Sequence, residues 1–360
     1  MIKLNINKVA FFLGLLTIYF LLSLGQFLYA IKFNVPWFGT EDFASYYQMA
    51  KNPLNHSVET PWHSTRILTP LIAWFFWQIN FYIKTTDSPF IEGFKTLDGV
   101  SFDENILFAL IASNYFGLLF SAVLIFYILY LNFQKNSVNL LLLILFSLLI
   151  FLSPFNNFSV LTGVTEGVSI LIISLILYAI SRKNYLLYFI LIILSVFQRE
   201  LIPLLIFFII IFLPKSDFGI RWKLLPMIAF MLASLRILMN VNSSPLNINY
   251  SEKLAEISSD LSLHNIIFSL LFLNLFLIYI SLVVFNRKKC YPFSELLPLI
   301  FYFLSLVVLY FLQSVGLQNL IRMFSLANPY LIILIVGQIR TLLRKSEHEF
   351  ILISKDNSFI

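Results

Sequence analysis

The sequence predicts an all-α polytopic membrane protein that forms a single transmembrane domain over residues 1–360. Of these residues, 59% are hydrophobic and only 12% are charged, which is about half the charged share of a soluble domain. The mean hydropathy is +0.88. Apolar runs close to the roughly 20 residues that span a bilayer recur along the whole chain. A water-soluble globular fold is therefore excluded.

The apolar runs define the candidate spans. They lie at about 9–31, 67–83, 105–131, 138–153, 166–181, 185–198, 201–214, 224–240, 266–285, 293–312 and 323–340. Lys and Arg collect in the connectors that stay in the cytoplasm, so the basic connectors fix the orientation. All of the basic connectors lie on the same side of the membrane only if the run 67–83 does not cross it. This gives about ten transmembrane helices with both termini in the cytoplasm, or eleven if 67–83 also spans.

The first run, 9–31, follows Lys3 and Lys8 in the manner of a signal peptide. It is long and lacks a small-x-small cleavage site, so we interpret it as an uncleaved first span. The formal net charge of +6 fits basic cytoplasmic connectors, and no nucleic acid partner is expected. The single cysteine, Cys290, allows neither an internal disulfide nor a Cys-based metal site.

Residues 32–104 are predicted to form the first outer loop region. Thr40 can cap a juxtamembrane helix whose first turn holds Glu41 and Asp42, where the helix dipole favours negative charge. The segment 67–83 is rich in Trp and amide side chains, which favour the membrane interface. We therefore expect an interfacial or re-entrant helix there.

Two later segments also have predicted roles. The runs 185–198 and 201–214 are short for spans, and Gln198-Arg199-Glu200 joins them, which predicts a tight helical hairpin with a charged outer turn. The stretch 241–264 carries acidic residues at helical spacing. It is either a lid over an acceptor groove or a solvated surface helix.

Asp42 is followed four positions later by Tyr46. On a helix these side chains share a face, so a carboxylate and a phenol would be presented together. The simpler interpretation is a well-capped amphipathic surface helix without chemistry.

The stretch GTEDFASYYQMA, followed after a polar gap by TRILTPLIAW, resembles the first outer loop of GT-C-type membrane glycosyltransferases, and of the mannosyltransferase-like branches in particular. Shorter similarities are Thr165-Glu166-Gly167, Gln198-Arg199-Glu200, and Arg322 followed by Pro329. One departure is that the two acids are adjacent rather than spaced.

The resemblance implies an enzyme, a hexosyltransferase at the outer face of the cytoplasmic membrane. It would transfer a sugar from a polyprenyl-phosphate donor to an extracytoplasmic glycan, lipid or protein acceptor. Asp42 stands at the position of that family's catalytic carboxylate, and Glu41 is the second candidate. Such transfer needs a base for the acceptor hydroxyl and cations for the leaving phosphate.

Arg66, Arg199 and Arg322 are the candidates for binding that phosphate, because guanidinium matches phosphate oxygens in a bidentate manner. Charges at membrane depth usually face a cavity and serve function. The alternative is structural: Arg199 pairs with Glu200 or Glu166, and Arg322 extends to the interface.

Three acidic or phenolic residues complete the predicted substrate-binding set: Tyr46, Glu166 and Glu200. Glu166 either binds an acceptor hydroxyl or caps the helix that it opens. Arg236 is a further candidate.

A metal site is not predicted, although a divalent cation has potential ligands in the first outer loop. His56, Glu59, His63 and Asp42 carry suitable atoms, but their spacing matches no recognised ligand pattern.

Two other function classes remain open. An O-antigen-type polymerase or ligase uses lipid-linked substrates too, but it usually carries its key arginines in large late loops. A transporter or flippase should have broken helices at mid-membrane and matching halves, and the sequence contains no matching halves.

Overall fold

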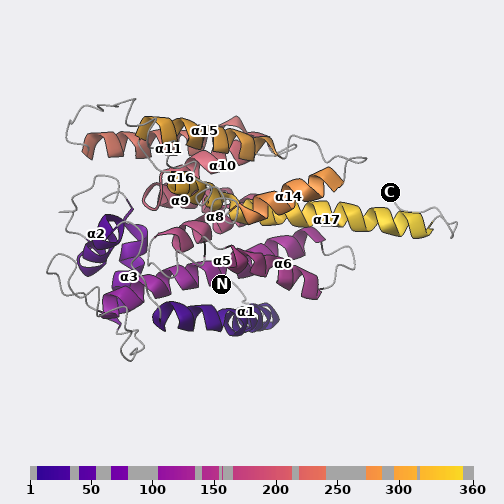
Figure 1. Cartoon of the computed structure of the whole chain (residues 1–360), viewed down its shortest axis with the longest axis horizontal. Helices are drawn as coiled ribbons and strands as arrows, with labels where there is room; N and C mark the ends of the chain where they lie inside the picture. The colour runs from indigo at the N-terminus through magenta and orange to yellow at the C-terminus, as the bar shows by residue number, and fades with distance from the viewer. Residues whose placement is uncertain are drawn as a thin grey trace.

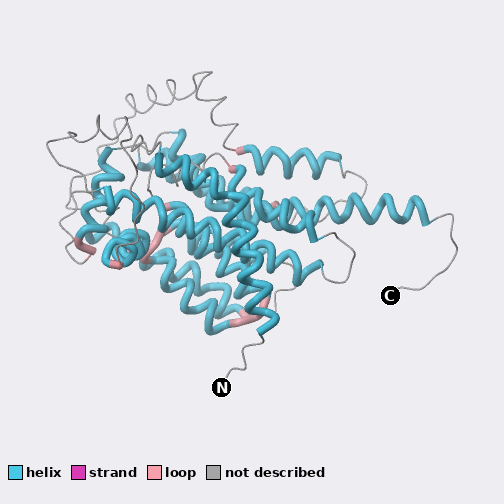
Figure 2. Tube along the Cα trace, turned by 90° about the horizontal axis from the view of Figure 1, so that it is seen from below, coloured by secondary structure: helices cyan, strands magenta, loops and turns pink. Residues whose placement is uncertain are grey.

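The protein is described here from a computed structural model. The structure describes residues 6–32, 40–53, 66–79, 104–133, 140–153, 156, 165–212, 219–240, 273–285, 296–313 and 317–351. Every regular element within these ranges is a helix, as Figure 2 shows. The predicted all-α class is thus confirmed for this part of the chain.

All of the described helices except α2 (Thr40–Lys51) overlap a predicted apolar run. The helices are α1 (Ile6–Lys32), α2 (Thr40–Lys51), α3 (Leu68–Gln78), α5 (Glu104–Phe133), α6 (Leu140–Leu152), α8 (Glu166–Ser181), α9 (Tyr185–Val196), α10 (Leu201–Phe212), α11 (Ile220–Asn240), α14 (Asn274–Phe285), α15 (Leu297–Gln313), α16 (Leu317–Phe324) and α17 (Asn328–Ile351), with the 3-10 turn η4 (Ser325–Ala327) before α17 (Figure 1).

Three helical stretches are long and apolar enough to cross a membrane: 10–30, 105–131 and 320–339. Shorter apolar helices accompany them, among them α6, α8, α9 and α10. This composition is that of a helical membrane protein, which agrees with the coarse prediction. The number of crossings and the sidedness of the termini stay predictions.

Helix α5 forms the centre of the fold. It packs against α1, α3, α6 and α8, and more lightly against α2 and α17. Most of its apolar length is buried, whereas most of α1 is exposed. At the contact with α8, a Cβ atom added to Gly117 would lie 2.6 Å from the carbonyl oxygen of Gly167. Small residues therefore allow α5 and α8 to approach backbone to backbone.

The periphery of the described helices is apolar. Exposed leucine, isoleucine and phenylalanine side chains cover the outer faces of α1, α9, α11 and α15. A soluble protein rarely exposes apolar patches of this extent, and lipid tails are the medium that such a surface suits.

The predicted last run, 323–340, is interrupted. Helix α16 ends at Phe324, η4 follows, and α17 begins at Asn328. Pro329 explains the restart, because a proline has no backbone N–H and fits the first turn of a helix. Arg322 thus belongs to α16 and not to the long final helix.

The first outer loop is described in part. Helix α2 forms where the juxtamembrane helix was expected. Helix α3 has 11 residues, nearly as many as α9 and α10, so its length does not separate a crossing from an interfacial or re-entrant helix, and this interpretation of 67–83 stays a prediction. Residues 80–83 and the stretch 241–264 lie outside the described residues.

Candidate functional site

The candidate site begins at α2, whose first turn contains Glu41 and Asp42. The side chains of both residues lie outside the described part of the structure. Further along α2, Tyr46 and Tyr47 are buried, and the helix packs against α3 and α5. The predicted catalytic acids therefore start a helix that is anchored in the core rather than a detached surface helix.

Arg66 connects α2 to the turn between α9 and α10. Its Nη1 donates to the Tyr46 hydroxyl at 3.2 Å. Its Nη2 and Nε donate to the two carboxylate oxygens of Glu200, at 2.8 and 3.4 Å. This bidentate arrangement fixes the guanidinium plane. Burial alone would raise the pKa of Glu200, but Arg66 and Arg199 together outweigh that effect and lower the pKa below its ordinary value.

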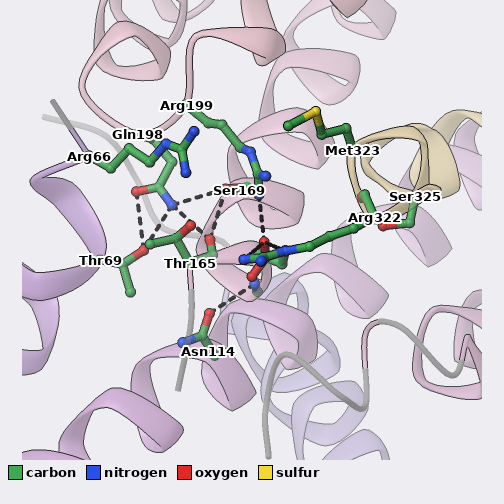
Figure 3. Close-up of polar contacts among 12 residues, drawn as sticks. Arg66, Thr69, Asn114, Thr165, Ser169, Gln198, Arg199, Arg322, Met323 and Ser325 are labelled. Atoms are coloured by element: carbon green, nitrogen blue, oxygen red, sulfur yellow. Dashed lines mark hydrogen bonds and ion pairs between the residues drawn. The ribbon is translucent and has the colours of Figure 1, made fainter. Parts of the chain in front are cut away.

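Glu166, the first residue of α8, bridges two further arginines. Its Oε1 accepts from Arg199 Nη1 at 2.6 Å and from Arg322 Nε at 2.7 Å. Arg199 comes from the α9–α10 turn and Arg322 from α16. In Figure 3 the two arginines reach toward each other from different elements. All three side chains are almost completely removed from solvent.

Gln198 holds the α9–α10 turn against α3 and α8 beside these ion pairs. Its Nε2 donates to Thr69 Oγ1, to the Thr165 carbonyl oxygen and to Ser169 Oγ, at 2.8, 2.8 and 3.0 Å. Figure 3 shows these contacts next to Arg199. Because Gln198 directly precedes Arg199, the hydrogen bonds of the Gln198 amide position the backbone from which the Arg199 side chain extends.

The start of α8 is also held by α5. The backbone N–H of Gly167 donates to Asn114 Oδ1 at 2.9 Å, and Asn114 is buried. The backbone next to Glu166 is therefore held to α5 by the Asn114 side chain, which positions the start of α8.

Three buried polar atoms of this cluster have no hydrogen-bond partner among the residues that the structure describes: Glu166 Oε2, Arg199 Nε and Thr165 Oγ1. Leaving a buried polar atom unsatisfied is costly, so each such atom in a native protein calls for an explanation. Here one is a cationic donor, one an anionic acceptor and one a hydroxyl.

The structure brings together six of the eight predicted site residues: Tyr46, Arg66, Glu166, Arg199, Glu200 and Arg322. We define these six, with Gln198, as the arginine cluster. The predicted charged turn between α9 and α10 is present, and Arg199 and Glu200 are buried in it because each pairs with a residue from another element. Its position on the outer side of the membrane stays a prediction.

Sequence reasoning left out the residues that support the cluster. Gln198, Thr69 and Thr165 were not among the predicted site residues, although each lies within a stretch that the sequence analysis singled out. The available signal was their position in the sequence. Gln198 directly precedes Arg199, Thr165 directly precedes Glu166, and Thr69 lies three residues after Arg66.

Other candidates lie elsewhere. The Arg236 guanidinium lies 5.1 Å from the centre of the Phe197 ring, a cation–π contact next to the cluster rather than within it. No group of three potential metal ligands occurs among the described residues. His56, Glu59 and His63 fall outside them.

Comparisons of the chain with protein-family models, with curated proteins and with solved structures find no match. The function is therefore inferred from the cluster. It combines three guanidinium groups and two carboxylates among the described side chains, a composition that suits recognition of an anion bearing hydroxyl groups.

Proposed function

We propose that this chain is a membrane glycosyltransferase of GT-C type. It transfers a sugar from a polyprenyl-phosphate donor to a hydroxyl of an extracytoplasmic acceptor, with both termini of the protein in the cytoplasm. The observation that carries the proposal is the convergence of Arg66, Arg199 and Arg322 on one buried cluster. Three buried arginines add little to the stability of the fold, because the free energy lost on desolvation offsets most of the Coulombic attraction to their carboxylates.

The cluster suits the leaving group of such a transfer. When the acceptor oxygen attacks C1 of the sugar, the bond between C1 and the phosphate oxygen breaks, and negative charge develops on the phosphate. Preorganised guanidinium groups in a low-dielectric site stabilise that charge. Arg66, Arg199 and Arg322 are the groups that would do so.

The acceptor proton needs a base, and α2 supplies the candidates. Asp42 would take the proton as the new glycosidic bond forms, with Glu41 as the second candidate. The hydrogen bond from Arg66 to Tyr46 supports this assignment, because it ties the cluster to the helix that begins with these two acids. Tyr46 would then orient α2 against the donor phosphate.

The test is sugar transfer from a panel of radiolabelled polyprenyl-phosphate sugars by purified protein in detergent. Asp42→Asn should reduce transfer by about a hundredfold or more, the usual contribution of a general base, while donor binding persists. Lys51→Gln, an exposed change at the other end of α2, is the matched control and should leave transfer intact.

Two results contradict the proposal. Transfer that survives in Asp42→Asn but is lost in Glu41→Gln moves the base by one residue. No transfer by the wild type with any donor, together with movement of the lipid-linked sugar across vesicle membranes, replaces the enzyme with a transporter.

A further inference from the structure

Glu166 binds its two arginines in an asymmetric way. Both guanidinium groups donate to Oε1, at 2.6 and 2.7 Å. The other oxygen, Oε2, is buried and has no hydrogen-bond partner among the described residues. A purely structural carboxylate in so dry a position gains most when both oxygens are bound. The Arg66–Glu200 pair, which uses both carboxylate oxygens, is the local example.

An anionic oxygen between two guanidinium groups is also the arrangement that a phosphate oxygen adopts in arginine-based sites. Arg199 keeps an unsatisfied Nε donor beside it. A phosphate carries more acceptor oxygens than a single carboxylate oxygen offers. Exchange of Glu166 for a phosphate would therefore satisfy a donor that the present contact leaves unpaired.

We propose that the Glu166 carboxylate occupies the position of the substrate's phosphate between Arg199 and Arg322, and that the phosphate group of the lipid-linked sugar displaces it on binding. This inference rests on the proposed function and narrows it. Arg199 and Arg322 form the phosphate site, whereas Arg66 remains paired with Glu200 and Tyr46.

The displaced carboxylate has a use in the same site. Glu166 cannot leave its position without another donor, because a buried carboxylate without a partner is costly. A sugar phosphate brings hydroxyl groups with its anion, and a hydroxyl can donate to Glu166. A ligand with phosphate alone satisfies the arginines only, so a glycosylated phosphate is the better occupant.

If a phosphate must displace Glu166, it binds only those molecules in which Arg199 and Arg322 are available. The apparent affinity for phosphate is then the intrinsic affinity multiplied by the fraction of such molecules. Weakening the Glu166 contact should therefore tighten phosphate binding. A structural ion pair predicts the reverse, because disordered arginines bind an anion less well. The two alternatives thus differ in sign and not only in size.

The experiment measures binding of farnesyl phosphate to the full-length protein in detergent by isothermal titration, with farnesol and inorganic phosphate as separate probes. Glu166→Gln removes the charge at nearly constant volume and should tighten farnesyl phosphate binding by about tenfold. Farnesol should bind equally to wild type and variant. Inorganic phosphate should gain as farnesyl phosphate does if the site accepts free phosphate, and stay weak if the lipid is required.

Glu166→Asp is the second variant, and it decides alone if Glu166→Gln does not fold. It retains the charge, but its shorter side chain weakens both contacts, and binding should tighten severalfold. Glu200→Asp is the matched control, since it shortens the other buried glutamate of the cluster. Unchanged or weaker binding in the Glu166 variants, or equal tightening in Glu200→Asp, overturns the inference.

Failure of this inference and failure of the proposed function give different results. A wild type that transfers sugar, with Glu166 variants that bind farnesyl phosphate no more tightly, overturns the inference alone. Tighter binding in the variants of a protein that transfers no sugar overturns the enzyme and leaves the phosphate site.

Discussion

The charged residues of the cluster lie in pairs that differ in geometry. Arg66 and Glu200 form a bidentate pair, whereas Arg199 and Arg322 share one oxygen of Glu166. Removal of one partner from a buried pair is far more damaging than replacement of both, because it leaves an uncompensated charge. A single substitution and a double substitution within one pair are therefore expected to differ strongly in their effect on stability.

We predict that Glu200→Ala lowers the free energy of unfolding by about 3–5 kcal/mol, since Arg66 is then buried without its carboxylate. The double variant Arg66→Met, Glu200→Met should recover most of that loss, because two apolar side chains of similar length fill the same space. Denaturant unfolding in detergent micelles measures both.

The control for this prediction is Lys51→Met, which removes an exposed charge from α2 and should change stability by no more than about 0.5 kcal/mol. A double variant that is as unstable as Glu200→Ala contradicts the argument, because hydrogen bonding and not charge compensation would then dominate.

At the scale of elements, the α5–α8 contact determines where Glu166 lies. Gly117 and Gly167 face each other without side chains between the helices, and Asn114 binds the Gly167 N–H. A Cβ atom at Gly167 would collide with the backbone of Asn114. Backbone cannot move aside as a flexible side chain can, so α8 would have to shift.

Gly167→Ala is therefore predicted to destabilise the protein by about 1–3 kcal/mol, the usual cost of overpacking. It should also tighten farnesyl phosphate binding, because a shift of α8 weakens the contacts of the preceding residue, Glu166, with Arg199 and Arg322. Thermal unfolding and titration in detergent measure the two effects.

Gly25→Ala in α1 provides the matched comparison. An added Cβ at Gly25 meets no atom within 4 Å, and alanine favours a helix over glycine by up to about 1 kcal/mol. Stability should stay constant or rise, with phosphate binding unchanged. Equal behaviour of the two alanine variants would remove the close approach of α5 and α8 as the cause.

At the scale of the whole molecule, the described helices bury a charged cluster within an apolar core and also expose apolar side chains at their periphery. The arginine cluster is buried among α3, α8, α16 and the α9–α10 turn, while leucine and phenylalanine cover the periphery. This distribution is stable only where the surrounding medium is itself apolar. The exposed surface of α1 is the clearest case, since most of its length faces outward.

Leu21→Arg, near the middle of α1, should therefore reduce recovery in the membrane fraction. Leu21 is 62% exposed, and an arginine at the centre of a spanning helix costs about 2.5–3.5 kcal/mol. Ile220→Arg, at the first residue of α11 and 69% exposed, is the control. A helix end lets arginine reach the interface, so its recovery should match that of wild type.

The sequence alone determined the elements. Hydropathy is a local property, so the runs at 166–181 and 185–198 predicted α8 and α9 to within a few residues. It also singled out charged residues that the structure pairs in the interior, because a charge within or beside an apolar run stands out against its neighbours. The chemistry of single residues was therefore visible before the fold.

Only the tertiary structure decided the partners. Glu166 meets Arg322 across 156 positions, and Arg66 meets Glu200 across 134. The sequence left open whether Arg199 pairs with its neighbour Glu200 or with Glu166, and the structure pairs it with Glu166. Which charges meet depends on how α3, α8 and α16 pack together. No local pattern encodes that packing, because a buried charge is compensated only when all of these helices are in place.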